Sequence, residues 1–455
     1  MRRTREDAYL DELSRLVVDA SFADLSDRAR DHVRWVVADC LPVIGAGMQV
    51  GEMKALVATH LRTAAPGSAW VIGTGRRASA LDAALLNGTA GTWLELDEGN
   101  LYAKGHPGIQ VVPAAVAVAQ ECAVSGAELL LAVALGYEVC ARISRAARVR
   151  MPVHPHGTYG VIGAAVAVGR MRRFAPAAMR QLINVAATMG MATSRNTLLE
   201  GATVRNIYSG HSGFMGIMAV RLVEAGFTGE SDGVRSIFGQ VLSDGFDPEA
   251  VVAGLGREWL LADGYFKLHP TGRYVHSAID AMEDALAKAP GDGIQVDDID
   301  RIEVRAYKMA AFLAEKAVTS SFGARFSIPF ALATILYHGR SGLAAFDEAA
   351  VRNQRIQALA ARVAVEEDPA FTAAYPTQQR CTVTLRLKGG ETLEGKCTVT
   401  KGEAGNPHQP SELERKFFDL SVPIWGAATA EELYATCMSL ERVSDFRGFA
   451  ERIAL

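Results

Sequence analysis

The chain has 455 residues, of which 47 are Lys or Arg and 51 are Asp or Glu, so its formal charge is −4. This near balance disfavours a nucleic-acid-binding protein, which carries a basic excess, and a hydrophobic content of 49% excludes a disordered chain. The length predicts two or three domains with large cores. The six cysteines are too scattered for a disulfide framework or a thiolate metal site, which favours buried thiols in a reducing compartment.

Neither a secretion signal nor a membrane span is expected. Residues 1–10 are charged and lack an apolar stretch. No uncharged apolar run reaches the roughly 18 residues that a membrane-spanning helix needs. We therefore expect a cytoplasmic protein that has neither a membrane nor a nucleic acid as a partner.

Apolar residues recur at helical spacing through the first 260 residues, and this periodicity predicts a series of buried helices. Runs of Ala and Gly, such as residues 114–119 and 163–167, favour helices that approach one another closely. The predicted helices are Asp11–Val18, Ala29–Cys40, Leu81–Glu95, Val112–Val124, Ala127–Arg145, Gly160–Met171, Pro176–Met191 and Gly201–Gly226.

The pattern changes after residue 268. Alternating residues predict a strand at Asp300–Tyr307 and a hairpin that starts at Thr382–Lys388, turns at Gly389-Gly390 and ends near Thr400. Further helices are predicted at Phe326–His338, Phe346–Ala361, Ser411–Leu420 and Ala430–Leu440. The predicted fold is thus mainly α. Residues 1–267, completed by 406–455, form a large all-helical domain, and residues 268–405 form a smaller α+β domain, here called the lid domain.

Common cofactor motifs are absent from the sequence. Gly73-Thr74-Gly75 resembles the start of a dinucleotide loop, but it lacks the third glycine and the strand-then-helix context, so a surface turn is predicted. The sequence contains no Walker loop, no HExxH and no Gly-x-Ser-x-Gly. We therefore expect neither a cofactor nor a metal.

Polar residues concentrate in three short segments between apolar helices, at residues 93–108, 151–158 and 266–276. Five of the ten histidines fall there, together with the carboxylates of residues 95–98 and the cations Lys267 and Arg273. Singly, such residues are usually helix caps, turns or surface charges. Together they favour a pocket for an anionic substrate at the junction of the two domains.

Such a pocket suits proton removal from a carbon α to a carboxylate. Lys and Arg can neutralise the carboxylates while a histidine or a carboxylate moves the proton. Dehydration, decarboxylation and epimerisation of small di- or tricarboxylates share these requirements, so the residues alone leave the three reactions open.

The segments resemble those of the MmgE/PrpD family, which includes 2-methylcitrate dehydratase, cis-aconitate decarboxylase and iminodisuccinate epimerase. The resemblance implies a large helical domain with a smaller α+β lid, a homodimer and catalysis without metal. Its landmarks are Asn87-Gly88, Leu94–Asn100 with His106-Pro107, Gly136-Tyr137-Glu138, His154-Pro155 through Gly160, Glu224–Gly229, Arg273–His276, Phe326–Pro329 and Lys416-Phe417.

The resemblance also implies functional residues. His106 and His154 match the two active-site histidines and would form the acid/base pair, Lys267 matches the lysine of the junction motif, and Glu95 stands where the decarboxylases have an aspartate. The catalytic residues implied are His106, His154, Lys267, Glu95 and Asp97. The substrate-binding residues implied are Arg205, which stands in place of a lysine, with Arg273, His276, His269 and Glu98.

The foremost functional hypothesis is a cofactor-independent lyase that dehydrates a 2-methylcitrate-like hydroxy acid. An epimerase or isomerase and a decarboxylase of a small di- or tricarboxylate are the alternatives. A non-catalytic binding protein is disfavoured because His106, His154 and Lys267 are retained. Gly99 stands where a threonine is expected, and it would make room for the larger substrate of a pathway-specific dehydratase or cyclase.

Overall fold

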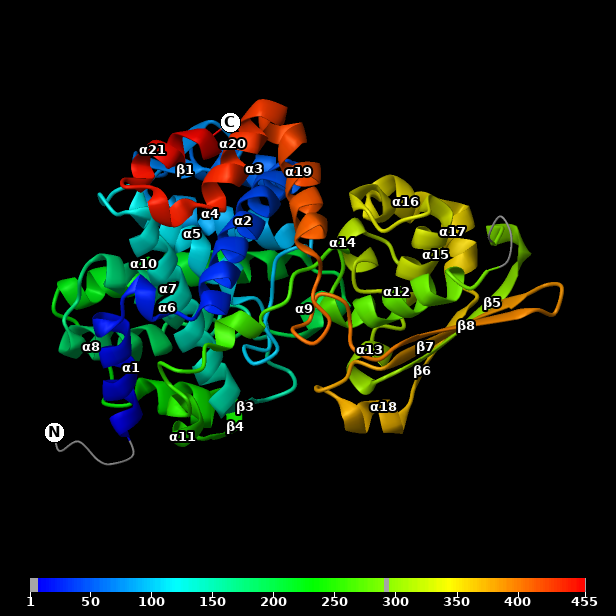
Figure 1. The fold of residues 1–455 in the computed structure, drawn as a ribbon, viewed down its shortest axis with the longest axis horizontal. Coiled ribbons are helices and arrows are strands. Elements are labelled where there is room, and N and C mark those ends of the chain that lie inside the picture. Colours follow the sequence, from blue (N-terminus) through cyan, green and yellow to red (C-terminus); the bar gives the residue numbers. More distant parts are fainter. Residues whose placement is uncertain (1–6, 290–293, 455) are drawn as a thin grey trace.

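The structure, a computed structural model, describes residues 7–289 and 294–454, so most of the N-terminal segment considered for a secretion signal lies outside the described residues. Figure 1 shows a large helical body and a smaller body that carries a sheet. Both chain ends belong to the helical body, and the C-terminal helices return to it after the lid domain. The mainly α fold with a smaller α+β domain is confirmed.

The helical domain is built mostly from α-helices, with two short pairs of antiparallel strands. Its elements are α1 (Ala8–Asp19), α2 (Asp27–Met48), α3 (Gly51–His60), β1 (Ala69–Val71), β2 (Arg76–Ala78), α4 (Ala80–Trp93), α5 (Pro107–Ala119), α6 (Gly126–Ala146), β3 (Ala147–Val149), α7 (Gly160–Met171), α8 (Pro176–Ala187), α9 (Asn196–Leu199), α10 (Ile207–Glu224), β4 (Ser243–Phe246) and α11 (Pro248–Val252), followed near the C-terminus by α19 (Pro410–Trp425), α20 (Ala427–Cys437) and α21 (Phe446–Ala450).

The lid domain is a four-stranded sheet in the order β6-β5-β7-β8, with β5 and β6 parallel and the other pairs antiparallel. Helices cover one face of this sheet (Figure 1). Its elements are α12 (Arg273–Leu286), β5 (Ile299–Ala306), α13 (Lys308–Ala311), α14 (Ser321–Ala324), α15 (Ile328–His338), α16 (Glu348–Arg352), α17 (Gln354–Ala360), β6 (Val363–Glu367), α18 (Pro369–Ala374), β7 (Cys381–Leu387) and β8 (Thr392–Cys397).

Each body has its own hydrophobic core. The larger core gathers apolar residues of α1 to α8 and of α10, and it also takes in Leu413, Phe417 and Leu433 from α19 and α20. The smaller core lies within residues 275–397. These cores support the predicted domain boundaries at 267/268 and 405/406, which remain a prediction.

Small residues allow the central helices to pack almost backbone to backbone. A Cβ atom on Gly136 of α6 would lie 2.4 Å from the carbonyl oxygen of Gly163 in α7, and one on Gly163 would lie 2.9 Å from that of Gly136. Both distances are shorter than a van der Waals contact, so each helix needs a glycine at this crossing. The Ala- and Gly-rich sequence of these helices is therefore a packing requirement.

Two local predictions differ from the structure in detail. The predicted helix Phe346–Ala361 is divided into α16 and α17, because the side chains of Asp347 and Asn353 each accept a backbone N–H bond and start a new helix. The helical domain also contains the strands β1 to β4, which the periodicity did not indicate. Gly73-Thr74-Gly75 forms the turn between β1 and β2, as predicted.

No single helix within the described ranges is long and apolar enough to cross a membrane. Taken together, α2 and α3 have the length and composition of a membrane span, but the two helices are bent by 86° at the break between them. All six cysteines are free thiols, and five of them are buried, as predicted.

The crossing of α6 and α7 leads to a stability prediction. Gly163→Ala should destabilise the protein by about 1–3 kcal/mol because its methyl group overlaps the backbone of α6. Gly51→Ala is the matched control, because no atom lies within 4 Å of its Cβ position. Denaturant unfolding of both variants is the measurement. Equal stability of Gly163→Ala and wild type would contradict the close helix crossing.

Candidate active site

The site is organised around a left-handed residue at the end of α4. Glu95 has a φ of 52°, a conformation that non-glycine residues rarely adopt. Its side chain is buried, and both carboxylate oxygens contact cations. Backbone strain at a buried charged residue is typical of functional sites, since the surrounding contacts must compensate for it.

Two cations from distant segments meet at Glu95. Arg205 Nη1 lies 2.5 Å from one carboxylate oxygen, and Lys267 Nζ lies 3.1 Å from the other. Lys267 also donates to the carbonyl oxygen of Glu95 and lies 3.8 Å from Asp97. Burial raises the pKa of Glu95, but Arg205 and Lys267 outweigh burial and hold this pKa below its ordinary value. Glu95 is therefore ionised.

His106 forms a buried pair with Asp97. His106 is the residue directly before α5, and its Nδ1 lies 2.7 Å from a carboxylate oxygen of Asp97. Burial lowers the pKa of His106 although Asp97 opposes this effect, and His106 together with Lys267 holds the pKa of Asp97 below its ordinary value against burial. The imidazole is thus neutral beside an ionised carboxylate, with its proton on Nδ1 and a lone pair on Nε2.

His154 faces a hydrogen-bond donor at each ring nitrogen. Its Nδ1 accepts a 3.1 Å hydrogen bond from the backbone N–H of His156, and its Nε2 lies 3.4 Å from Nε of Arg205, which can only donate. Burial, and after it the Arg205 charge, lowers the pKa of both histidines well below the ordinary value. The ring of His156 lies between the rings of His106 and His154, with centroids 4.7 Å from each.

The five residues predicted to be catalytic therefore meet in one buried cluster, together with Arg205. We call this group the histidine–carboxylate cluster; it comprises Glu95, Asp97, His106, His154, His156, Arg205 and Lys267. Glu95 and Asp97 carry two negative charges, and Arg205 and Lys267 carry two positive charges. The charges of the cluster are therefore balanced within the protein.

Glu98 does not join this cluster. One of its carboxylate oxygens accepts a hydrogen bond from the backbone N–H of Gly108, and the other accepts one from the Tyr137 hydroxyl at 2.8 Å. Burial raises the pKa of Glu98 to about 8, so the group is protonated at neutral pH. These contacts favour a structural role over the predicted substrate-binding role.

Arg273, His276 and His269 form a second group at the start of the lid domain. Arg273 forms a 2.8 Å ion pair with Glu403, and its Nη1 lies 3.1 Å from His276 Nδ1. The ring of His269 lies 5.0 Å from that of His276, and its Nε2 lies 3.8 Å from Asp280. The positive charge of Arg273 is thus already paired, as those of Arg205 and Lys267 are, and its role in holding a substrate carboxylate stays a prediction.

The space beside Gly99 is filled. A Cβ atom on Gly99 would lie 2.4 Å from both Cζ and Oη of Tyr265, whose backbone exchanges two hydrogen bonds with that of Gly99. The Tyr265 ring stacks under the Arg273 guanidinium at 4.3 Å and contacts the ring of His106 edge-on. The expectation that Gly99 makes room for a larger substrate is therefore wrong, because the Tyr265 ring occupies that volume.

Several residues that shape this region had no predicted role in the site. Gln110 donates to the backbone oxygen of His106 and accepts from the backbone N–H of Gly157, so it joins two histidine segments. A lone amide four residues after His106, within an apolar helix, was the available signal. Lys416 of α19 supports the site loop through Asp39 and the carbonyl oxygen of Leu96.

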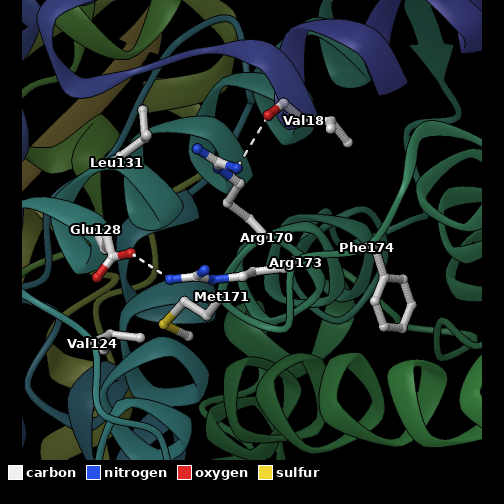
Figure 2. Close-up of a pocket in the computed structure, with 8 residues that line it drawn as sticks. All are labelled: Val18, Val124, Glu128, Leu131, Arg170, Met171, Arg173 and Phe174. Carbon is white, nitrogen blue, oxygen red and sulfur yellow. Dashed lines mark hydrogen bonds and ion pairs between the residues drawn. The ribbon is translucent and has the colours of Figure 1, made fainter.

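Two described cavities lie outside the cluster. One of about 550 Å³ opens at the domain junction, and Phe266 and Glu403 among its lining residues place it beside Lys267 and Arg273. Another of about 300 Å³ lies on the helical domain, where Arg170 donates to the Val18 carbonyl oxygen and Arg173 faces Glu128 (Figure 2). No residue of the histidine–carboxylate cluster lines the second cavity.

The fold and the site define a two-domain, mainly helical protein with a buried acid–base cluster at the domain junction. The sequence models of the MmgE/PrpD N-terminal domain and the MmgE/PrpD C-terminal domain match residues 11–250 and 269–440, respectively. The chain therefore belongs to the MmgE/PrpD family, as the sequence analysis indicated.

Curated relatives are similar along most of the chain. A cis-aconitate decarboxylase of Aspergillus terreus (strain NIH 2624 / FGSC A1156) is 23% identical, covering 96% of this chain and 93% of the relative. A cis-aconitate decarboxylase-like protein, oryM, of Aspergillus oryzae (strain ATCC 42149 / RIB 40) is 23% identical, covering 82% of each chain.

The protonation of Glu98 leads to a prediction about pH. In the unfolded chain its pKa is near the ordinary 4.5, and in the folded protein it is about 8, so the folded state holds a proton that the unfolded state releases. Glu98 should therefore make stability fall as pH rises from about 4.5 to 8. Glu98→Gln, a neutral isostere, should reduce that fall, as measured by denaturant unfolding across this pH range. An unchanged pH profile would mean that Glu98 is ionised.

The contact between Gly99 and Tyr265 leads to a prediction about coupling. Gly99→Ala should destabilise the protein by about 1–3 kcal/mol, because the new methyl group overlaps the Tyr265 ring. In the double variant with Tyr265→Ala that overlap is absent. The double variant should therefore lose at least about 1 kcal/mol less stability than the sum of the losses in the two single variants. Strictly additive losses would show that the ring does not occupy this space.

Proposed function

We propose that this protein is a lyase that moves one proton on a small di- or tricarboxylate, foremost in the dehydration of a 2-methylcitrate-like hydroxy acid. The observation that carries the proposal is the buried Asp97–His106 pair beside two cations. Asp97 directs the proton of His106 to Nδ1, and this leaves Nε2 free to act as a base.

The two histidines would have different roles because their ring nitrogens have different partners. His106 would accept a proton at Nε2, where no hydrogen bond is found among the described residues. His154 would hold the Arg205 guanidinium in place, because its Nε2 lies 3.4 Å from Arg205 Nε. Burial lowers the pKa of both rings, which favours the neutral form that a base needs.

Dehydration would proceed by proton transfer through His106. His106 would take the proton from the carbon α to a carboxylate, while Lys267 and Arg205 stabilise the negative charge that develops on that carboxylate. The C–H electron pair would form the double bond, and hydroxide would leave from the neighbouring carbon. The imidazolium of His106 would protonate that hydroxide, so the products are an unsaturated acid, water and the original neutral His106.

Decarboxylation is the second candidate reaction, and the named relatives favour it. Two proteins similar to most of this chain are named for cis-aconitate decarboxylation. Their identity of 22–23% supports the class of reaction more strongly than the substrate. The same cluster suits this reaction, in which CO₂ leaves, the double bond shifts and a histidine that has first taken up a proton from solvent supplies it to carbon.

Incubation with citrate, 2-methylcitrate, cis-aconitate and malate in D₂O, followed by proton NMR and CO₂ detection, tests the proposal. Loss of an α-proton signal with new vinyl signals and no CO₂ indicates dehydration. New vinyl signals with CO₂ indicate decarboxylation. Exchange of the α-proton without net reaction indicates an epimerase. No change in the proton signals and no CO₂ with any of the four acids would contradict the proposal.

His106→Asn should lower turnover by about 100- to 10,000-fold while leaving the fold intact, because its amide can still bind Asp97 but cannot act as the base. His60→Asn is the matched control, since His60 pairs with Asp82 at the same 2.7 Å distance outside the cluster. Circular dichroism and thermal unfolding check the fold of both variants. Wild-type turnover in His106→Asn would remove His106 from the mechanism.

A further inference from the structure

One buried cation in the described residues has no acidic partner. Six cationic side chains are buried, and five of them form ion pairs with a carboxylate. These five are Arg142, Arg205, Lys267, Arg273 and Lys416. The sixth, Arg325, is only 4% exposed and has no carboxylate within ion-pair distance among the described residues. An unpaired buried charge is costly to a folded protein, so its presence needs a reason.

Arg325 lies beside the histidine–carboxylate cluster although it comes from the lid domain. It directly follows α14, and its Nη1 donates to the carbonyl oxygens of Leu94, at 3.1 Å, and Pro270, at 2.9 Å. Leu94 is the neighbour of Glu95, and Pro270 follows Lys267 by three residues. The backbone oxygen of Arg325 accepts from Gly272, which anchors the residue to the same crossover segment.

Most of the guanidinium remains available for a ligand. Only Nη1 has hydrogen-bond partners among the described residues, which leaves the N–H groups of Nε and Nη2. These two nitrogens present the parallel pair of donors that binds a carboxylate with two hydrogen bonds. Burial lowers the pKa of Arg325 to about 10, with Glu95 opposing that effect, so the group is still charged at neutral pH.

The charge balance of the cluster also favours a ligand-binding role for Arg325. Glu95 and Asp97 already neutralise Arg205 and Lys267, so a substrate carboxylate entering the cluster would meet no surplus positive charge there. Arg325 supplies that surplus from the opposite domain.

We propose that Arg325 binds one carboxylate of the substrate and couples substrate binding to seating of the lid domain on the helical domain. This inference rests on the proposed function, because it assumes an anionic substrate in the cluster. Its contact with Leu94 crosses from the lid domain to the helical domain, so the full anion site is assembled when the lid is seated.

Binding of tricarballylate, cis-aconitate and malonate, measured by calorimetry and thermal shift, tests this inference with three proteins. Arg325→Met keeps the volume but removes the charge, and it should weaken binding by at least about 50-fold. Arg325→Lys keeps the charge but removes the paired donors, and it should weaken binding by about 5- to 10-fold. The unliganded melting temperature of Arg325→Met should stay close to that of wild type, because the variant also removes an unpaired buried charge.

Arg362→Met is the matched control. Arg362 is also a lid-domain arginine that donates to a backbone carbonyl, that of Ile299 at the start of β5. This variant should bind the three acids as wild type does. If it weakens binding as much as Arg325→Met, the effect belongs to lid-domain charge in general, and the inference fails.

The remaining outcomes separate the two proposals. Wild-type affinity in Arg325→Met, with turnover intact, would overturn the role of Arg325 and leave the proposed function standing. If Arg325→Met does not fold, Arg325→Lys decides: wild-type affinity in that variant would overturn the paired-donor site. If wild type binds none of the acids and turns over none of the substrates, both proposals are overturned.

Discussion

The Glu95 carboxylate connects the parts of the molecule that must come together in the site. It receives Arg205 from the segment before α10 and Lys267 from the crossover to the lid domain, and it lies on the turn that ends α4. Both cations are buried, and the Glu95 carboxylate offsets the cost of burying their charges. Glu95 makes both contacts from a left-handed backbone conformation, which the surrounding structure must stabilise.

The rest of the site follows from that arrangement. Lys267 also faces Asp97, and Asp97 fixes the tautomer of His106 at the start of α5. Gln110 of α5 links this helix by a hydrogen bond to the segment that carries His154 and His156. Four helical segments and the crossover are therefore held in register by buried polar contacts, while the Ala- and Gly-rich helices behind them supply a rigid support.

Much of the fold could be predicted from periodicity, because a helix or strand that buries one face repeats its apolar residues at 3.6 or 2 positions. The predictions were weakest where a single side chain determines where a helix begins. Asp347 and Asn353 do so, and they divide one expected helix into two. They also missed the short strands β1 to β4, since three or four residues carry too little periodicity to detect. The helices of the chain's end were predicted, and their support of the site through Lys416 was visible only in the packing.

The sequence by itself determined the family, the two-part architecture and the three segments in which the chemistry is concentrated, because each of these is a local pattern. The tertiary structure decided which of those residues act together. Glu95 and Lys267 are 172 positions apart, and no local period encodes their contact. The same holds for Tyr265, which fills the space beside Gly99, and for Arg325, whose lack of an acidic partner within residues 7–289 and 294–454 appears only when every neighbour is in place. Charge pairing and tautomers depend on those neighbours, so they are properties of the folded molecule.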